Sequence, residues 1–237
     1  MKVENYNILG IIPARGGSKG VIRKNIRLVA DKPLIHWSIA EAKKSTLLSN
    51  YYVTTDDDEI AEVATLCGAQ VIDRPSELAQ DKTPMIPVLQ HLCREAELLN
   101  GIKYDYILLM QPTAPMRTSD DIDKAIELLV SDEYFDSLVS VYQVDDCHPS
   151  RMYTCDSGRL IPFYEEPAGS LRQDLLPVYH RNGAIYMSSR KLLMADGKLV
   201  SDNTLAYVMS KNDSANIDDE DDLLIADFLM KKRLELK

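Results

Sequence analysis

Short apolar runs alternate with stretches of helical periodicity over much of this 237-residue chain. The run Tyr106–Met110 is apolar throughout, which is typical of a strand buried on both faces of a parallel sheet. The predicted strands cover residues 8–12, 51–55, 70–73, 106–110, 137–144, 181–187 and 205–209. The alternation predicts an α/β fold with a mostly parallel sheet, in a single domain that spans residues 1–237.

The stretches between the predicted strands carry apolar residues at helical spacing. Pro33 suits an early turn of the first helix, and Ser119 is predicted to cap another. Asn182-Gly183 is predicted to form a tight turn that leads into the strand at 181–187. The predicted helices cover residues 34–44, 60–67, 87–99, 119–129 and 223–228.

The segment from Ile11 to Asn25 carries the densest chemical signal in the chain. Pro13 ends the first strand because proline has no N–H to donate, and three glycines then allow main-chain N–H groups to approach a ligand closely. The basic residues crowded into or beside this segment are Arg15, Lys19, Arg23, Lys24 and Arg27. Backbone N–H groups and cations together hold phosphate chains, so the segment predicts a cradle for a polyanion. The alternative is a glycine-rich surface turn whose basic side chains are solvated.

This segment matches neither of the two common phosphate-binding motifs, G-x-x-x-x-G-K-[ST] and G-x-G-x-x-G. A P-loop ATPase and a dinucleotide-dependent dehydrogenase are therefore disfavoured. The net charge of −10 argues against general binding of nucleic acid or of anionic membranes. The four cysteines form no C-x-x-C pair, which disfavours a zinc site and predicts reduced thiols. With no signal-peptide pattern and no apolar run of ~20 residues, we expect a soluble cytoplasmic protein.

Three further segments are candidates for function. The loop Gln111–Arg117 follows a predicted central strand, and ligands of open α/β sheets bind at the carboxyl ends of strands. From residue 145 to 179 the alternation breaks, and a loop of this length is usually functional or an interface. Five acids stand together at Asp218–Asp222, where we weigh a magnesium role for Asp218 against simple capping of the last helix.

Three motifs in this order resemble those of the acylneuraminate cytidylyltransferase family, the CMP-sialic acid synthetases, and the resemblance runs from about Ile8 to Met230. The motifs are Ile11–Gly20 with Lys24-Asn25, Leu109–Arg117 and Asn182–Tyr186. The resemblance implies a Rossmann-like three-layer nucleotidyltransferase fold with a dimerisation insert at 145–179. It also implies transfer of CMP from CTP to the anomeric hydroxyl of a nonulosonic acid, with release of pyrophosphate and a need for Mg²⁺.

The resemblance also assigns roles to residues of this chain. The catalytic residues would be Arg15, Lys24 and Asp218. The nucleotide would be bound by Arg15, Gly16, Ser18, Lys19, Lys24, Asn25, Arg74, Asp81 and Thr83. The acid sugar would be bound by Gln111, Tyr186, Leu199, Val200 and, from the partner of a homodimer, Arg151 and Arg172. The metal would be held by Asp218 and Asn216.

The chain departs from the family pattern at three places. Asn216 stands where family members often have an aspartate, which predicts weaker metal binding. Leu199 and Val200 stand where some neuraminate-specific members have an aromatic pair, and His180 replaces a basic residue. Two alternatives therefore stay open: the same reaction on legionaminate, pseudaminate, the deaminated nine-carbon acid or an octulosonate, and a nucleotide-binding relative without turnover.

Overall fold

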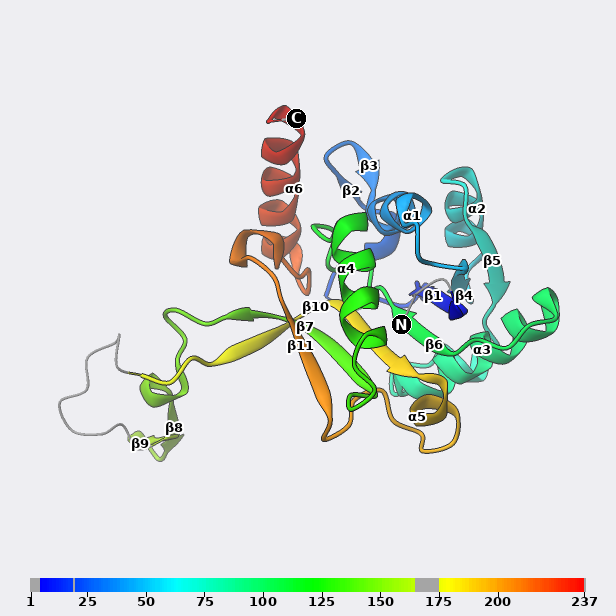
Figure 1. Ribbon diagram of the computed structural model, residues 1–237. Coiled ribbons are helices and arrows are strands. Elements are labelled where there is room, and N and C mark those ends of the chain that lie inside the picture. The colour runs from blue at the N-terminus through cyan, green and yellow to red at the C-terminus, as the bar shows by residue number, and fades with distance from the viewer. Residues whose placement is uncertain (1–4, 19, 165–174, 237) are drawn as a thin grey trace.

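The computed structural model describes residues 5–18, 20–164 and 175–236 and contains a seven-stranded sheet flanked by helices (Figure 1). The sheet has the order β11-β7-β10-β6-β1-β4-β5, and β10 is its one strand antiparallel to its neighbours. Its strands are β1 (Ile8–Pro13), β4 (Asn50–Thr55), β5 (Gln70–Asp73), β6 (Tyr106–Leu109), β7 (Ser137–Gln143), β10 (Tyr179–Ser189) and β11 (Thr204–Val208). Two small hairpins are formed by β2 (Leu28–Val29) with β3 (Lys32–Pro33) and by β8 (Tyr153–Asp156) with β9 (Arg159–Pro162). The predicted α/β fold with a mostly parallel sheet is confirmed.

Helices cover both faces of the sheet. The α-helices are α1 (Leu34–Lys44), α2 (Asp58–Leu66), α3 (Met85–Asn100), α4 (Ser119–Val130), α5 (Arg190–Met194) and α6 (Glu220–Glu235). The first apolar cluster packs α1, α2 and α4 against one face, and a second packs α3 and α5 against the other. A third cluster seats α6 on the segment around β2. Helix α6 stands beyond the end of the sheet in Figure 1, next to the hairpin of β2 and β3.

Two local predictions are wrong in detail. Helix α4 is capped by Thr118 rather than Ser119, because Thr118 and Asp121 form a reciprocal capping box. Asn182-Gly183 lies inside β10 and is not a turn that precedes it. The pairing of β10 with β7 shifts register between Arg181 and Tyr186, and Gly183 takes a φ of 74°, a conformation that favours glycine. The pair therefore lies at a β-bulge within β10.

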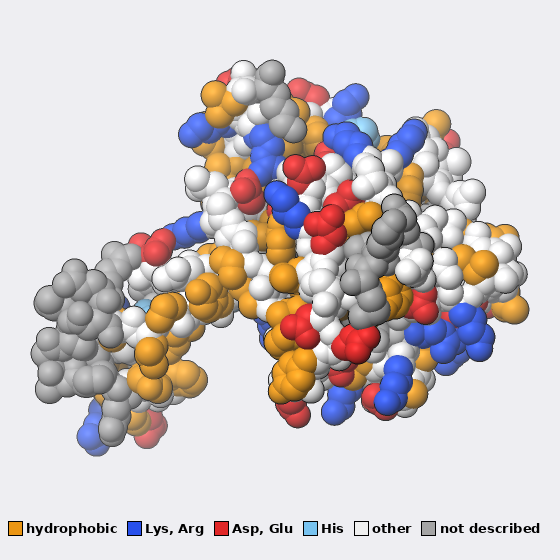
Figure 2. All heavy atoms as spheres, viewed as in Figure 1, with side chains coloured by type: hydrophobic (Ala, Val, Ile, Leu, Met, Phe, Trp, Pro, Cys, Tyr) orange, Lys and Arg blue, Asp and Glu red, His pale blue; other side chains and the backbone are white. Residues whose placement is uncertain are grey.

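The described part of the segment 145–179, where the alternation breaks, forms an arm. It includes the β8–β9 hairpin and a short 3₁₀ turn at Pro149–Arg151. Every residue of the two hairpin strands is exposed. Figure 1 shows the hairpin far from the sheet, and Figure 2 shows hydrophobic side chains gathered along the arm. Its large exposed apolar residues are Met152, Tyr153, Leu160, Ile161, Phe163, Tyr164, Leu176 and Tyr179.

Candidate active site at the carboxyl edge of the sheet

The loop after β1 and the segment before α6 meet at the carboxyl edge of the sheet. The ammonium group of Lys24 donates to the carbonyl oxygen of Ile217 at 2.6 Å and to that of Asp218 at 3.3 Å. A Cβ atom on Gly20 would collide with the same Asp218 carbonyl, so only glycine permits this approach. Asn25 is buried and donates to the carbonyl oxygen of Arg15 at 3.0 Å, which closes the loop on itself. Lys24 and Ile217, which are 193 residues apart in the sequence, thus lie together at one edge of the site.

The described arginines in and beside this loop pair with acids that are remote in the sequence. Arg15 pairs with Asp81 at 3.1 Å. Arg23 forks onto Asp57, and Arg27 forks onto Glu220 at 2.9 and 3.0 Å. The fold therefore brings a carboxylate to each of the described arginines, and the predicted polyanion cradle stays a prediction. Lys19 lies outside the described residues.

Arg74 lies beneath the loop at the end of β5. It is only 6% exposed, and its guanidinium donates to the carbonyl oxygen of Thr54 at 2.8 Å. Burial lowers the pKa of Arg74 to about 10, while the carboxylate of Asp56 acts in the opposite direction. Its Nε has no hydrogen-bond partner within the described part of the chain. A buried, charged guanidinium with one donor unused fits a position beside an anionic ligand.

A pocket of 380 Å³ opens on the other side of Asp218. Its floor is formed at the β10 bulge, where a Cβ on Gly183 would lie 2.9 Å from Oε1 of Gln111 and 3.2 Å from Oδ1 of Asn216. The lining residues are Gln111, Tyr142, His180, Arg181, Asn182, Gly183, Tyr186, Ser214, Asn216, Asp218 and Asp222. The structure thus brings together four residues predicted for sugar or metal binding: Gln111, Tyr186, Asn216 and Asp218.

Asp218 and Asn216 present oxygen atoms where the pocket meets the loop. The amide of Asn216 donates to the carboxylate of Asp218 at 2.9 Å, which leaves the amide oxygen of Asn216 turned toward Gly183. No group of three or more histidine, cysteine, aspartate or glutamate side chains placed for a metal ion occurs among the described residues. One carboxylate and one carbonyl oxygen still suit Mg²⁺, which takes few protein ligands and keeps water or substrate phosphate in its other positions. The two residues fit such an ion.

The other acids of the Asp218–Asp222 cluster mostly serve helix α6. Asp219 is the N-cap of α6 and accepts from the backbone N–H of Asp222, whose carboxylate accepts from the N–H of Asp219 in return. The same carboxylate also accepts from the N–H of Asp218 at 2.9 Å. Glu220 is the partner of Arg27. Capping therefore accounts for Asp219 and Asp222, although Asp222 also lines the pocket together with Asp218.

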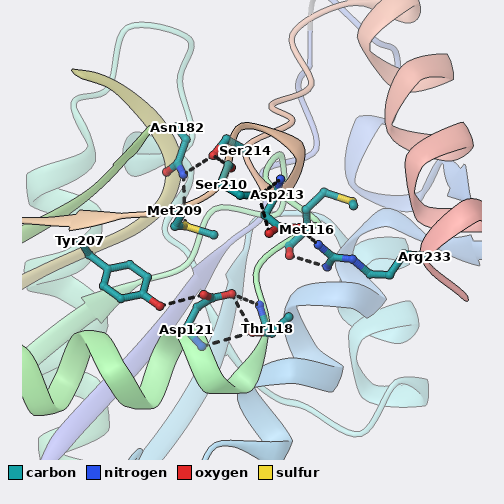
Figure 3. A network of polar contacts seen from close by, with 10 residues as sticks. All are labelled: Met116, Thr118, Asp121, Asn182, Tyr207, Met209, Ser210, Asp213, Ser214 and Arg233. Atoms are coloured by element: carbon teal, nitrogen blue, oxygen red, sulfur yellow. Dashed lines mark hydrogen bonds and ion pairs between the residues drawn. The ribbon is translucent and has the colours of Figure 1, made fainter. Parts of the chain in front are cut away.

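A network of polar contacts fixes the segment that carries Asn216 and Asp218 (Figure 3). Asn182, only 2% exposed, donates to Ser214 at 2.9 Å and accepts from Ser140 at 2.6 Å. Arg233, near the end of α6, reaches back to donate to the carbonyl oxygen of Met116 at 2.6 Å and to pair with Asp213. The segment is thus anchored to the sheet, to the loop after β6 and to its own following helix.

Arg117, the basic residue that ends the second motif, does not reach the site. It is 1% exposed and donates to the carbonyl oxygen of Ala184 at 2.5 Å and to the hydroxyl of Ser38 at 2.7 Å. Burial lowers the pKa of Arg117 to about 10, against the raising effect of nearby Asp121 and Glu41. Its guanidinium therefore links the backbone of β10 at Ala184 to the side chain of Ser38 in α1.

Several predicted site residues lie apart from the pocket. Leu199 packs half-buried on the cluster around α3, Val200 is exposed, and neither lines the pocket. Arg151 is exposed on the arm, and Arg172 lies outside the described residues. Thr83 donates to the carbonyl oxygen of Glu77 in the loop that carries Asp81. The proposed ligand roles of these residues, and of Ser18, stay predictions.

Three lining residues, Tyr142, Arg181 and Ser214, are not among the site residues predicted from the sequence. The antiparallel register of β7 and β10 places Tyr142 opposite His180, with ring centroids 5.5 Å apart. Recognising from the sequence that β10 runs antiparallel to β7 would have predicted that Tyr142 and His180 face each other. The Asn-Gly dipeptide offered that signal, but it also fits a hairpin turn.

The mixed sheet, with a glycine-rich basic loop after its first strand, agrees with the Rossmann-like nucleotidyltransferase fold expected from the sequence. Residues 9–212 match the family model described as cytidylyltransferase, and the chain belongs to that family. A search of solved structures finds the fold in a CMP:2-keto-3-deoxy-manno-octonic acid synthetase complexed with CTP, with a TM-score of 0.72 and 16% identity over 96% of this chain and 99% of that one.

Curated relatives lie close in sequence. The chain is 32% identical to the N-acylneuraminate cytidylyltransferase of Escherichia coli O18:K1:H7 (strain RS218 / NMEC) over 95% of its length, and it spans 52% of that longer protein. It is 34% identical to the CMP-N,N'-diacetyllegionaminic acid synthase of Legionella pneumophila subsp. pneumophila (strain Philadelphia 1 / ATCC 33152 / DSM 7513), covering 96% of this chain and 98% of that protein. In the part of the chain that the structure describes, no helix has the length and apolar character needed to cross a membrane.

Proposed function

We propose that the protein transfers CMP from CTP to the anomeric hydroxyl of a nonulosonic acid and releases pyrophosphate. The observation that carries this proposal is the junction at Asp218. On one side the loop reaches it through Lys24, and on the other side lies a 380 Å³ pocket lined by Gln111 and Tyr186. A triphosphate on the loop would end beside a pocket whose volume falls in the usual range for small-ligand sites.

The chemistry follows from positioning and charge. The sugar hydroxyl oxygen attacks the α-phosphorus of CTP, the new O–P bond forms, the bond from that phosphorus to the bridging oxygen of pyrophosphate breaks, and the hydroxyl proton passes to solvent. Lys24 and Arg15 would stabilise the negative charge that builds on the phosphate oxygens, as charge-stabilising donors do in acyl transfer. Arg74, charged and buried under the loop, would add to this field. The protein forms no covalent intermediate in this scheme.

The acid sugar would lie in the pocket against Gln111 and Tyr186. Gln111 offers both an amide donor and a carbonyl acceptor to sugar hydroxyls, and Tyr186 offers a half-buried phenol. Because Gly183 has no Cβ, the amide oxygens of Gln111 and Asn216 can both lie against its backbone. A guanidinium group from Arg151 or Arg172 of a second copy would suit the sugar carboxylate.

Asp218 and Asn216 would hold a Mg²⁺ ion. The ion, when bound, would neutralise charge on the pyrophosphate leaving group. Within the chain, the contact from Asn216 to Asp218 holds the carboxylate at the boundary between loop and pocket. Lys24 fixes the backbone of the same residue from the loop side.

We further propose a homodimer formed through the arm at 145–179. The exposed apolar side chains of the β8–β9 hairpin and its flanks support this, because contiguous exposed apolar surface usually marks an interface. A cytoplasmic location is the companion proposal. Its support is that Cys67, Cys93, Cys147 and Cys155 are free thiols, which suits a reducing compartment.

The identity of the sugar is the finer part of the proposal. The relatives named above act, by their names, on N-acylneuraminate and on N,N'-diacetyllegionaminate, so both classes are candidates. Asn216 favours one further candidate, a relative that binds nucleotide without turnover, because an amide is a weaker magnesium ligand than a carboxylate.

The test is release of pyrophosphate from CTP and Mg²⁺ with a panel of acid sugars: N-acetylneuraminate, legionaminate, pseudaminate, the deaminated nine-carbon acid and an octulosonate. We expect sugar-dependent release that a chelator abolishes and a preference for one nine-carbon acid. CTP binding in calorimetry without release from any sugar would favour the non-catalytic candidate. Absence of CTP binding would overturn the proposal.

A further inference from the structure

We propose that Arg23 and Asp57 form a clamp that holds the loop after β1 in its nucleotide-binding conformation before CTP arrives. The proposal rests on the proposed CTP site and adds two positioning residues to it. Neither residue faces the pocket, and neither has a part in the scheme above. The Arg23–Asp57 clamp joins the far end of the loop to the first turn of α2.

The contact between the two side chains is bidentate. The guanidinium of Arg23 donates to the two carboxylate oxygens of Asp57 at 2.5 and 3.0 Å, and it also pairs with Glu59. The side chains of Arg23 and Asp57 are 33% and 20% exposed. A planar fork on a carboxylate fixes direction as well as distance, so this pair constrains the orientation of Arg23.

The backbone of Arg23 needs such a constraint. Arg23 has φ 57° and ψ 33°, the left-handed region that residues with a Cβ rarely adopt. Its carbonyl oxygen accepts from the N–H of Ile26 and opens the 3₁₀ turn Lys24–Ile26. The left-handed residue therefore sets the direction in which Lys24 and Asn25 leave the loop.

Asp57 and its neighbour Asp56 also hold the near end of the loop. The N–H of Gly16 donates to Asp56 at 3.1 Å, and a Cβ on Gly16 would lie 2.6 Å from a carboxylate oxygen of Asp57. Both ends of the loop thus rest on the residues that follow β4. The glycine is needed there because its backbone packs directly on the carboxylate that Arg23 grips.

Asp57 itself is rigidly placed. It is the N-cap of α2, accepts from the N–H of Ile60 at 3.0 Å, and donates its own N–H to Thr55 at 3.2 Å. The hydrogen bonds from Arg23 hold the pKa of the Asp57 carboxyl below its ordinary value. The clamp therefore ties the loop to a helix whose position the core fixes, so CTP binding need not order the loop.

The experiment separates this role from direct contact of Arg23 with phosphate. Arg23→Gly removes the guanidinium and accepts the left-handed backbone without strain. Asp57→Asn removes the charge and keeps a good N-cap for α2. Glu59→Gln is the matched control, because it removes the outer partner of Arg23 and leaves Asp57 in place. The measurements are the CTP dissociation constant by calorimetry, kcat at saturating CTP, and amide hydrogen exchange over residues 14–25 without ligand.

We expect Arg23→Gly and Asp57→Asn each to weaken CTP binding about tenfold. We expect kcat at saturating CTP within about twofold of the wild type, and the double variant no worse than the worse single one. Amide hydrogen exchange over the loop should quicken in both variants and stay unchanged in Glu59→Gln.

Tighter or unchanged CTP binding in Asp57→Asn would overturn the clamp, because a freed Arg23 would then be acting on phosphate. Unchanged loop exchange in the free protein would also overturn it, whether or not CTP binds. If the wild-type protein binds no CTP but loop exchange still quickens in Arg23→Gly and Asp57→Asn, the proposed function is wrong and the clamp stands.

Discussion

The two halves of the site are built in opposite ways. In the half formed by the loop after β1, charged side chains are paired with acids from distant parts of the chain, as in Arg15 with Asp81 and Arg27 with Glu220. In the pocket half, most of the lining is uncharged, and buried hydrogen bonds such as those of Asn182 fix its walls. A ligand that binds the arginines of the loop must replace their carboxylate partners, whereas a ligand of the pocket enters a cavity whose walls are already fixed. Substitutions should therefore change affinity for CTP on one side and geometry on the other.

The largest effect is expected for Lys24→Ala. Lys24 carries charge on the loop side and is also bonded to the carbonyl oxygens of Ile217 and Asp218. Its loss should lower kcat/KM for CTP by about 10²–10³-fold, by analogy with the loss of one charge-stabilising donor. Pyrophosphate release at varied CTP measures this. Lys32→Ala, which removes an exposed lysine of β3, is the matched control. Near wild-type turnover would show that the loop does not hold the triphosphate.

Arg117→Ala tests whether the second motif acts on the ligand or on the fold. Removing a fully buried side chain leaves a cavity and strips the Ala184 carbonyl oxygen of its donor. The free energy of unfolding should fall by about 3 kcal/mol, measured by urea denaturation. Arg117→Met, which fills most of the space, should lose less. Arg27→Ala is a surface control, expected to cost under about 1 kcal/mol. An unchanged denaturation midpoint together with lost activity would instead place Arg117 among the ligands.

Asn216→Asp tests whether residue 216 binds magnesium at the boundary between the loop and the pocket. A second carboxylate beside Asp218 adds charge repulsion that a divalent cation relieves, so the Mg²⁺ concentration for half-maximal activity should fall several-fold. The measurement is a magnesium titration of pyrophosphate release at fixed CTP and sugar. Asn212→Asp adds the same charge in an exposed turn and serves as the control. An unchanged or higher magnesium requirement would remove Asn216 from the metal site.

Local features of the fold could be predicted from the sequence because their causes are local. The bounds of α1 and β5 agree with the predictions, since apolar spacing decides them, but Pro33 is the N-cap of α1 and not a residue of its first turn. The cap of α4 was misplaced by one residue because Thr118 and Ser119 are both good capping residues, and the choice depends on the carboxylate of Asp121. Asn182-Gly183 fits a turn locally, but pairing with β7 makes it a bulge.

The candidate site also has features that local sequence predicts and contacts that depend on the fold. Its loop and motifs were visible in the sequence, since glycine, basic and amide residues cluster there. The pairing of Arg15 with Asp81 was not visible, because the two residues are 66 positions apart and meet only through the sheet order. The burial of Arg117 was equally hidden, since a basic residue in a proline-rich loop is usually solvated.

The smallest effect, from Asp81→Asn, gives the most direct test of partner exchange. The resemblance of this chain to its family predicts that Asp81 lies near the nucleotide, and the structure pairs it at 3.1 Å with Arg15, another predicted nucleotide-binding residue. If Asp81 occupies Arg15 until phosphate replaces it, removing its charge should lower KM for CTP roughly two- to fivefold, the range that a half-exposed ion pair allows. Raising the ionic strength should shrink this gain, because salt screens the pair. Glu77→Gln makes the same charge change nearby and should leave KM unchanged. A higher KM in Asp81→Asn would mean that the carboxylate contacts the nucleotide itself, and the two halves of the site would then differ less than their partners suggest.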